Sequence, residues 1–419
     1  MIISRSNISF LIILSFISIC FLYLFDLSLS HIINFWTFSQ SHLNYSHGFV
    51  QRGLFGTIIL FLEEAFKINT RYSFAIFFII IYSLNALLFL IIIYKYRSYK
   101  FLLFFLGLSP TLIMFSFNDL GGYQRFDALS IFLMMLHSHF VFLYRSKKIN
   151  LDKYLNIFNF TIFPLIMISL FVHEIQAWSL FFHFFINFMV LKENKLSLFS
   201  LYIKIIISFL VVIFVFFYPV SQETINQIVN DLSSREIWLD AVIVASRTEG
   251  NLGIINYELK TNLFNIYNFK INLFFTLLSI LPFNFFMIYY RNKNIISFQK
   301  NSLIYLNLSV IPFLSYFAIG DTGRWINLIS FTAFSFFAQF PFKKNIEDKL
   351  SKVFEIKKVL LFLIIFIYCF FNRLPHCCNL QEKNITIWGG VFKKVEALYN
   401  IYIIKNKNKH YNFDERFKK

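Results

Sequence analysis

The sequence predicts an all-α, polytopic membrane protein. Of its 419 residues, 58% are hydrophobic and only 15% are charged, a composition far from that of soluble domains. The apolar residues form long runs, and about 20 apolar residues suffice for one helix to cross a bilayer. Lysine and arginine lie mostly in short loops between alternate runs, and this pattern is typical of loops on the cytoplasmic side.

The apolar runs predict about eleven transmembrane helices, within a range of about 10–12. The first run, residues 8–25, follows Arg5. It is long for a signal peptide and lacks an A-x-A-like cleavage site, so we expect an uncleaved helix and a cytoplasmic N-terminus. The helices are expected near residues 7–25, 73–94, 101–117, 126–144, 155–172, 175–191, 197–219, 270–290, 302–319, 324–340 and 358–371.

These helices are expected to form a single integral membrane domain, residues 1–372, followed by a basic C-terminal tail, residues 373–419. An odd number of helices places this lysine-rich tail outside, against the usual charge pattern, so the side of the tail stays open. Four prolines fall within the predicted helices, where kinks are tolerated in membranes. They are Pro110, Pro164, Pro282 and Pro312.

Two segments between the helices are long and are predicted to lie outside. The first, residues 26–72, contains an apolar stretch, Gly48–Phe66. Because that stretch also carries Arg52 and two glutamates, we predict an interfacial or re-entrant helix and not a full crossing. The second segment, residues 220–269, is polar and longer than most connections, which favours a functional role.

The composition argues against two other classes of protein. A net charge of +17 is typical of nucleic-acid binding, but here the basic residues lie in loops between apolar runs, so we expect no nucleic-acid partner. The four cysteines show neither a CxxC pair nor a Cys/His spacing, which argues against a zinc site or a disulfide framework. We therefore expect no metal site and no cofactor.

Four short polar clusters interrupt the apolar sequence. They are residues 44–53, 118–127, 173–176 and 320–325. The predicted topology places all four on the outer side of the membrane. Because polar and ionisable groups at membrane depth are energetically expensive, their convergence on one side predicts a functional site.

The arginines in these clusters are candidate anion-binding residues. An arginine among apolar residues needs an anion to offset its desolvation, and a guanidinium binds phosphate or carboxylate in a bidentate manner. Arg52, Arg125 and Arg324 fit this role, and His47 and Asp321 are further candidates for substrate binding. The alternatives are an arginine that reaches to lipid headgroups and an i, i+3 pair of Asp321 with Arg324 that closes the turn.

The carboxylates of the clusters are candidate catalytic groups. His173 and Glu174 lie between two apolar runs with hardly any loop. We expect desolvation to raise the pKa of Glu174 and to suit it to general base or acid catalysis. A turn between two helices is the alternative. Asp127 is a further candidate, although the helix dipole also explains an acidic residue there. Three further histidines within the predicted helices are candidates for a proton relay, but we expect them at scattered depths and therefore predict packing residues: His137, His139 and His183.

In its pattern along the whole chain, the sequence resembles the bacterial repeat-unit polymerases of O-antigen and capsule synthesis, the Wzy-like and EpsG-like proteins. The resemblance lies in the Gly48–Gly56 segment (GFVQRGLFG), in His173-Glu174 and in the Asp321–Trp325 segment (DTGRW). It implies a GT-C-like glycosyltransferase of the inner membrane that joins undecaprenyl-pyrophosphate-linked oligosaccharides at the periplasmic face. The interfacial helices of that fold would correspond to residues 26–72.

The resemblance also implies roles for the candidate residues. Arg52, Arg125 and Arg324 would bind the pyrophosphate, Glu174 would be the base and His173 would orient it. The acidic pair that such enzymes often carry in the first outer loop is missing here, so the base stays open among Glu174, Asp127 and Asp321. The implied partners are the lipid-linked oligosaccharide, membrane lipids and a chain-length regulator.

Two rival functions are the alternatives. A glycosyltransferase that uses a polyprenyl-phosphate sugar needs the same arginines. A flippase of lipid-linked oligosaccharides predicts charges along a path through the membrane and two related halves, whereas the charges here cluster at one side.

Overall fold

The structure is a computed structural model that describes residues 5–29, 35–118, 123–192, 195–233, 266–292, 301–313 and 322–342 and the single positions 363 and 368. The described chain is all-α. Six of its helices are long and apolar enough to cross a membrane, as expected of a helical membrane protein. They lie at Asn7–Asp26, Thr70–Tyr94, Asp127–Arg145, Leu151–Val172, Leu196–Phe217 and Leu273–Asn292.

The helices follow one another with short connections through most of the described chain. Their bounds are α1 Arg5–Leu29, α2 Phe35–Gln40, α3 Gly53–Phe66, α4 Thr70–Tyr94, α5 Lys100–Leu108, α6 Phe115–Asn118, α7 Asp127–Arg145, α8 Leu151–Ile157, η2 Phe158–Ile162, α9 Phe163–Val172, α10 Gln176–Leu191, α11 Lys195–Phe217, α12 Gln222–Leu232, α15 Ile266–Asn292, α16 Asn301–Val310 and α17 Thr322–Ala338. The predicted helix near 358–371, apart from positions 363 and 368, the C-terminal tail 373–419 and most of segment 220–269 lie outside the described residues.

Two prolines have different effects on the predicted helices, because Pro110 follows the end of a helix and Pro164 lies within a continuous one. The segment near 101–117 is not one helix, because α5 ends at Leu108 and Ser109 adopts an extended conformation before Pro110, as a residue before proline tends to do. Pro164 lies instead in the first turn of α9, directly after the π-helical turn η2, and there the chain stays helical. The wider turn accommodates the missing N–H of the proline, since Phe163 bonds to the carbonyl of Phe158, five residues back.

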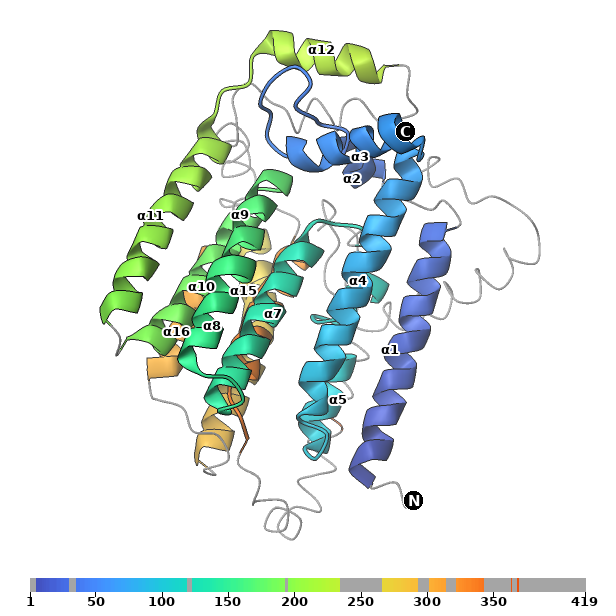
Figure 1. The fold of residues 1–419 in the computed structure, drawn as a ribbon. Coiled ribbons are helices and arrows are strands. Elements are labelled where there is room, and N and C mark those ends of the chain that lie inside the picture. Colours follow the sequence, from blue (N-terminus) through green and yellow to red (C-terminus); the bar gives the residue numbers. More distant parts are fainter. Residues whose placement is uncertain are drawn as a thin grey trace, which may run out of the picture.

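The long helices stand side by side, with α7 near the middle of the bundle (Figure 1). α7 packs against α4, α10 and α17, whereas α1 contacts α4 and α5 at one margin and α11 contacts α9 and α10 at another. One continuous apolar core joins residues from α1 to α17. The apolar side chains that remain exposed on α1, α4 and α11 form the surface expected to face lipid.

Two short helices lie across one end of the bundle, which we call the α3 end (Figure 1). α3 lies over the ends of the long helices and exposes Ile58, Phe61 and Phe66, as an interfacial helix would. α12 covers the loop before α3 and buries Ile225 and Ile228, together with Leu232, against Leu43 and Val50. The two outer segments predicted from the sequence therefore pack against each other.

The opposite end, which we call the basic end, carries the start of α1 and the α4–α5, α7–α8 and α10–α11 connections (Figure 1). Its described cations include Lys95, Arg97 and Lys100 after α4, Lys147, Lys148 and Lys153 after α7, and Lys192 after α10. The two ends of the bundle thus differ in charge.

Candidate functional site

Arg52 immediately precedes α3 and forms a bidentate ion pair with Glu174. Its Nε donates to Oε2 of Glu174 at 2.7 Å, and its Nη2 donates to Oε1. The third donor, Nη1, bonds to Oε1 of Gln40 at 2.8 Å. The side chains of Arg52 and Glu174 are only 15% and 12% exposed, so this pair lies in a largely desolvated position.

The backbone around Arg52 is tightly constrained. Arg52 adopts a left-handed conformation with φ 63°, which is uncommon for a side chain with a Cβ and costs about 1–3 kcal/mol. Two glycines allow the first turn of α3 to approach the preceding loop. A Cβ on Gly53 would lie 2.2 Å from the ring of Tyr45, and one on Gly56 would lie 1.8 Å from the carbonyl oxygen of Leu43. These close approaches hold the start of α3, and with it the backbone of Arg52, against the preceding loop.

His173 and Glu174 form the turn between α9 and α10. His173 ends α9 in an extended conformation, and its Nδ1 accepts a hydrogen bond of 3.2 Å from the N–H of Ile175. Burial lowers the pKa of His173 to about 3, so the ring is neutral at ordinary pH and carries its proton on Nε2. Nδ1 lies 3.5 Å from Oε2 of Glu174 but has no proton to donate. The contact that orients Glu174 therefore comes from Arg52.

The prediction that the pKa of Glu174 is raised was wrong. Burial does raise the pKa of this carboxyl, but the charge of Arg52 and the hydrogen bonds that Arg52 donates outweigh it and hold the pKa well below 4.5. In this state Glu174 is ionised and paired. It becomes an effective base only if another anion takes its place on Arg52.

A second bidentate ion pair joins the starts of α7 and α17. Nε and Nη2 of Arg324 donate to Oδ2 and Oδ1 of Asp127 at 2.6 and 2.8 Å. The two side chains are 14% and 8% exposed. Asp127 at the start of α7 is thus paired with an arginine of another helix. Asp321, the alternative partner of Arg324, lies outside the described residues.

The turn that carries Arg125 is held against α1. Gln124 has φ 58°, and its Nε2 donates to Oγ of Ser28 at 3.2 Å. The hydroxyl of Tyr123 lies 2.5 Å from the same oxygen. Arg125 is half-buried and close enough to Asp127 to interact with its carboxylate.

His173 lies between the two ion pairs. Its ring interacts electrostatically with Arg52, Glu174, Arg324 and Asp127. Gln176 ties the same turn to α7, because its Nε2 donates to the carbonyl of Phe126 at 3.2 Å and its Oε1 accepts from Ser130 at 2.5 Å. The structure therefore brings residues of all four polar clusters together at the α3 end.

His47 is turned toward α12. Its Nε2 lies 2.5 Å from Oδ2 of Asp231, and its carbonyl accepts from the hydroxyl of Thr224 at 3.4 Å. The side chains of His47 and Asp231 are 28% and 60% exposed. His47 thus links the two outer segments and does not contact the two buried ion pairs.

Sequence reasoning missed one polar position and set aside a second group of polar residues. Gln40, which holds Arg52, lies in the short helix α2 outside every polar cluster. A second group lies inside the bundle, where Nδ1 of His137 is 2.9 Å from Nδ1 of His183 and its Nε2 is 2.9 Å from the hydroxyl of Tyr154. That hydroxyl donates to Oδ1 of Asn187 at 2.7 Å. The prediction that His137 and His183 lie at scattered depths was therefore wrong.

Within the part of the chain that the structure describes, no group of three or more His, Cys, Asp or Glu residues is placed to hold a metal ion. Comparisons with protein-family models, with curated proteins and with solved structures find no match for this chain. The chemistry of the two ion pairs is therefore the basis for a functional proposal.

Proposed function

We propose that the protein is a glycan polymerase of the bacterial inner membrane. It joins oligosaccharide repeat units carried on undecaprenyl pyrophosphate into an O-antigen or capsular polysaccharide at the periplasmic face. The observation that carries this proposal is the meeting of Arg52, Glu174, Asp127 and Arg324 around the neutral His173 at one end of a helical membrane bundle. Arginines suit a diphosphate leaving group, and a carboxylate suits the removal of a hydroxyl proton.

The reaction has a balanced form at these residues. A sugar hydroxyl of one lipid-linked unit attacks the anomeric carbon of the other, and the bond from that carbon to the pyrophosphate oxygen breaks. The leaving electron pair stays on the pyrophosphate, whose charge is stabilised by Arg52, Arg125 and Arg324. The hydroxyl proton passes to Glu174. No nucleotide sugar is consumed.

The paired state of Glu174 gives this reaction an order of events. While Arg52 holds Glu174, the carboxylate is a weak base. A pyrophosphate that binds Arg52 displaces Glu174, removes the hydrogen bonds and charge that lower its pKa, and leaves a buried carboxylate. The pKa of a buried, unpaired carboxylate rises, so the base becomes effective when the donor is bound.

The fold and topology proposed with this function follow from the charge of the two ends. The basic end would face the cytoplasm, so the N-terminus would be cytoplasmic and the α3 end periplasmic. About eleven helices and a GT-C-like arrangement would complete the domain. Membrane lipids and a chain-length regulator are the expected partners.

Deletion of the gene and display of the surface glycan test the proposal. If the protein is the polymerase, cells keep a single repeat unit on lipid A core and lose the long chains. Loss of every repeat unit would show instead a flippase or an earlier step. Loss of one sugar from each repeat would show a transferase that uses a polyprenyl-phosphate sugar.

Single substitutions at the two ion pairs test the site. Arg52→Gln, Arg324→Gln and Glu174→Gln should each abolish long chains while the protein is still produced. Asp231→Asn, which changes an exposed pair at the same end, is the matched control and should leave long chains present. Normal polymer from all three site variants would disprove the proposed site.

A further inference from the structure

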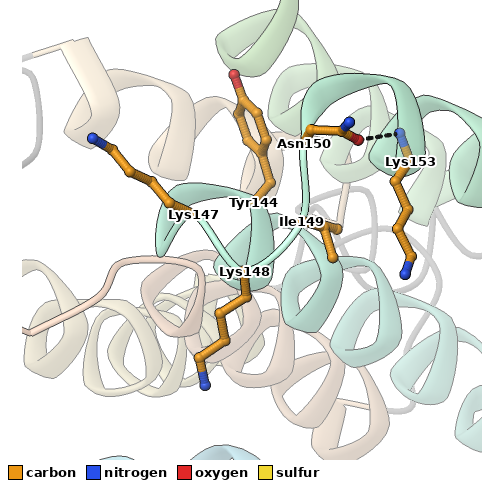
Figure 2. Close-up of a pocket in the computed structure, with 6 residues that line it drawn as sticks. All are labelled: Tyr144, Lys147, Lys148, Ile149, Asn150 and Lys153. Carbon is orange, nitrogen blue, oxygen red and sulfur yellow. Dashed lines mark hydrogen bonds between the residues drawn. The ribbon is translucent and has the colours of Figure 1, made fainter.

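A basic cleft lies at the opposite end of the bundle from the ion pairs. Its volume is about 490 Å³, and it is formed by the connection between α7 and α8. Figure 2 shows the six lining residues, in which three lysine side chains spread from the loop and from the start of α8. The lining residues are Tyr144, Lys147, Lys148, Ile149, Asn150 and Lys153.

The loop and the first turn of α8 carry three lysines and one acidic residue, Asp152, so the cleft keeps a net positive charge. Among the described residues, none of the three lysines forms a salt bridge. Lys95, at the end of α4, adds a fourth cation nearby, with its Nζ 3.5 Å from the centre of the Phe142 ring. Burial and the charge of Lys148 lower the pKa of Lys95 to about 7. The cations of this end therefore repel one another, and a bound anion would relieve that repulsion.

The backbone of the loop fixes the positions of these lysines. α7 ends in a Schellman motif, because the N–H of Lys147 bonds to the carbonyl of Tyr144 and the N–H of Lys148 bonds to that of Leu143. Lys147 takes the left-handed position with φ 58°, where glycine is usual. Asn150 then caps α8 by accepting from the N–H of Lys153 at 2.9 Å.

The position of the cleft favours a lipid as the source of the anion. Two membrane spans, Asp127–Arg145 and Leu151–Val172, end at this loop. The lysines therefore lie where the apolar part of each span stops, at the level of lipid headgroups. Tyr144, with an apolar ring and a polar hydroxyl, is a residue type enriched at that level.

We propose that this cleft binds the phosphate of an anionic phospholipid in the leaflet at the basic end, with Lys147, Lys148 and Lys153 as its ligands. The proposal does not depend on the polymerase function, because it concerns the other end of the molecule.

Competition between two lipids tests the proposal. The purified full-length protein in mild detergent is mixed with equal amounts of phosphatidylglycerol and phosphatidylcholine, and native mass spectrometry measures the lipid that stays bound. The wild type should retain phosphatidylglycerol preferentially. Each lysine near an anionic lipid surface contributes about a fivefold gain in affinity, so the triple Lys147→Gln, Lys148→Gln, Lys153→Gln variant should lose at least about tenfold of this preference.

Two comparisons make the test specific. The triple Lys→Arg variant keeps the charge and should keep the preference. The chain also offers a matched control, since Lys67 is likewise exposed and left-handed, with φ 58°, at the end of α3. Lys147→Gln should reduce the preference and Lys67→Gln should not. No preference in the wild type, an unchanged preference in the triple Gln variant, or equal loss in both single variants would overturn the proposal. So would displacement of the lipid by inorganic phosphate at equal concentration, which would identify a free anion as the ligand.

Discussion

Replacing Glu174 by Gln should destabilise the folded protein even when no substrate is present. Gln preserves the shape of the side chain but removes the charge that faces the guanidinium of Arg52. In the wild type that guanidinium makes two hydrogen bonds to Glu174 and one to the neutral Gln40. Removing one partner of a buried ion pair costs about 3–5 kcal/mol. Because the two side chains are still 15% and 12% exposed, we expect a loss near the lower limit, about 3 kcal/mol.

A double-mutant cycle separates the interaction free energy of Arg52 with Glu174 from the other effects of each substitution. The free energy of unfolding is measured in mixed micelles for the wild type, Glu174→Gln, Arg52→Gln and the double variant. If the two side chains stabilise the fold as a pair, the double variant should lose less than the sum of the two single losses, with a coupling of about 1–3 kcal/mol.

The exposed pair His47–Asp231 supplies the control for this cycle. Its side chains are 28% and 60% exposed, and pairs of this kind contribute about 0.2–1 kcal/mol. Asp231→Asn, the same change of carboxylate to amide, should therefore cost less than about 1 kcal/mol. Equal losses for Asp231→Asn and Glu174→Gln, or losses that simply add in the double variant, would refute the assignment of Arg52 and Glu174 as a buried pair.

Three further changes have outcomes that follow from the geometry. In Arg52→Gln, Glu174 is buried without a cation, and the pKa of Glu174 should rise above its ordinary value of 4.5. The folded state then binds more protons than the unfolded state. The melting temperature of this variant should therefore fall as the pH rises from 5 to 8. Gly56→Ala places a Cβ 1.8 Å from the carbonyl oxygen of Leu43, so α3 must shift, and both thermal stability and polymer length should decrease. Tyr154→Phe removes the hydroxyl that joins His137 to Asn187 and should lower the unfolding free energy by about 1–3 kcal/mol.

The controls for these three changes are available in the same chain. The wild type should show no contribution from Glu174 between pH 5 and 8, because its depressed pKa places the loss of stability at lower pH. Glu64→Ala, at an exposed position of α3, should leave polymer length unchanged. Tyr202→Phe, at a half-exposed position of α11, should change the unfolding free energy by less than about 0.5 kcal/mol. Equal effects in the test and control variants would contradict each prediction.

Hydropathy predicted the long helices because their signal is local. The runs that became α1, α4, α7 and α11 are apolar over nearly their whole length, so no knowledge of the neighbouring helices was needed. The break between α5 and α6 was missed although its cause is also local, namely the effect of Pro110 on Ser109. Proline is tolerated inside one membrane helix and ends another, and the choice depends on whether neighbouring groups satisfy the freed carbonyls.

The site depends on information that a single sequence carries only in part. Topology predicted that the four polar clusters share one side, but the partners themselves come from packing. Arg52 and Glu174 are 122 positions apart, and Asp127 and Arg324 are 197 apart. Desolvation alone predicted a raised pKa for Glu174, and that prediction failed because the cation that reverses the shift comes from a distant segment.

The similar depths of the two buried histidines, His137 and His183, could have been predicted from the sequence. α7 and α10 both begin at the α3 end and run in the same direction through the bundle (Figure 1). His137 lies ten residues after the start of α7 at Asp127, and His183 lies seven residues after the start of α10 at Gln176. At 1.5 Å per residue their depths differ by only about 5 Å, within the reach of two side chains. Counting from the helix ends would have brought them together.

The ion pair of Arg52 with Glu174 restricts the kind of ligand that the candidate site can bind. Arginines at membrane depth are expensive to bury without a counter-charge, and Arg52 meets this requirement with Glu174. A ligand that takes the place of this carboxylate must therefore supply negative charge and at least two acceptor oxygens, since Nε and Nη2 of Arg52 both donate to Glu174. A neutral sugar can offer acceptor oxygens but not the negative charge, whereas a phosphate supplies both. If the protein has the proposed function, this geometry favours recognition of the phosphate part of the lipid-linked substrate.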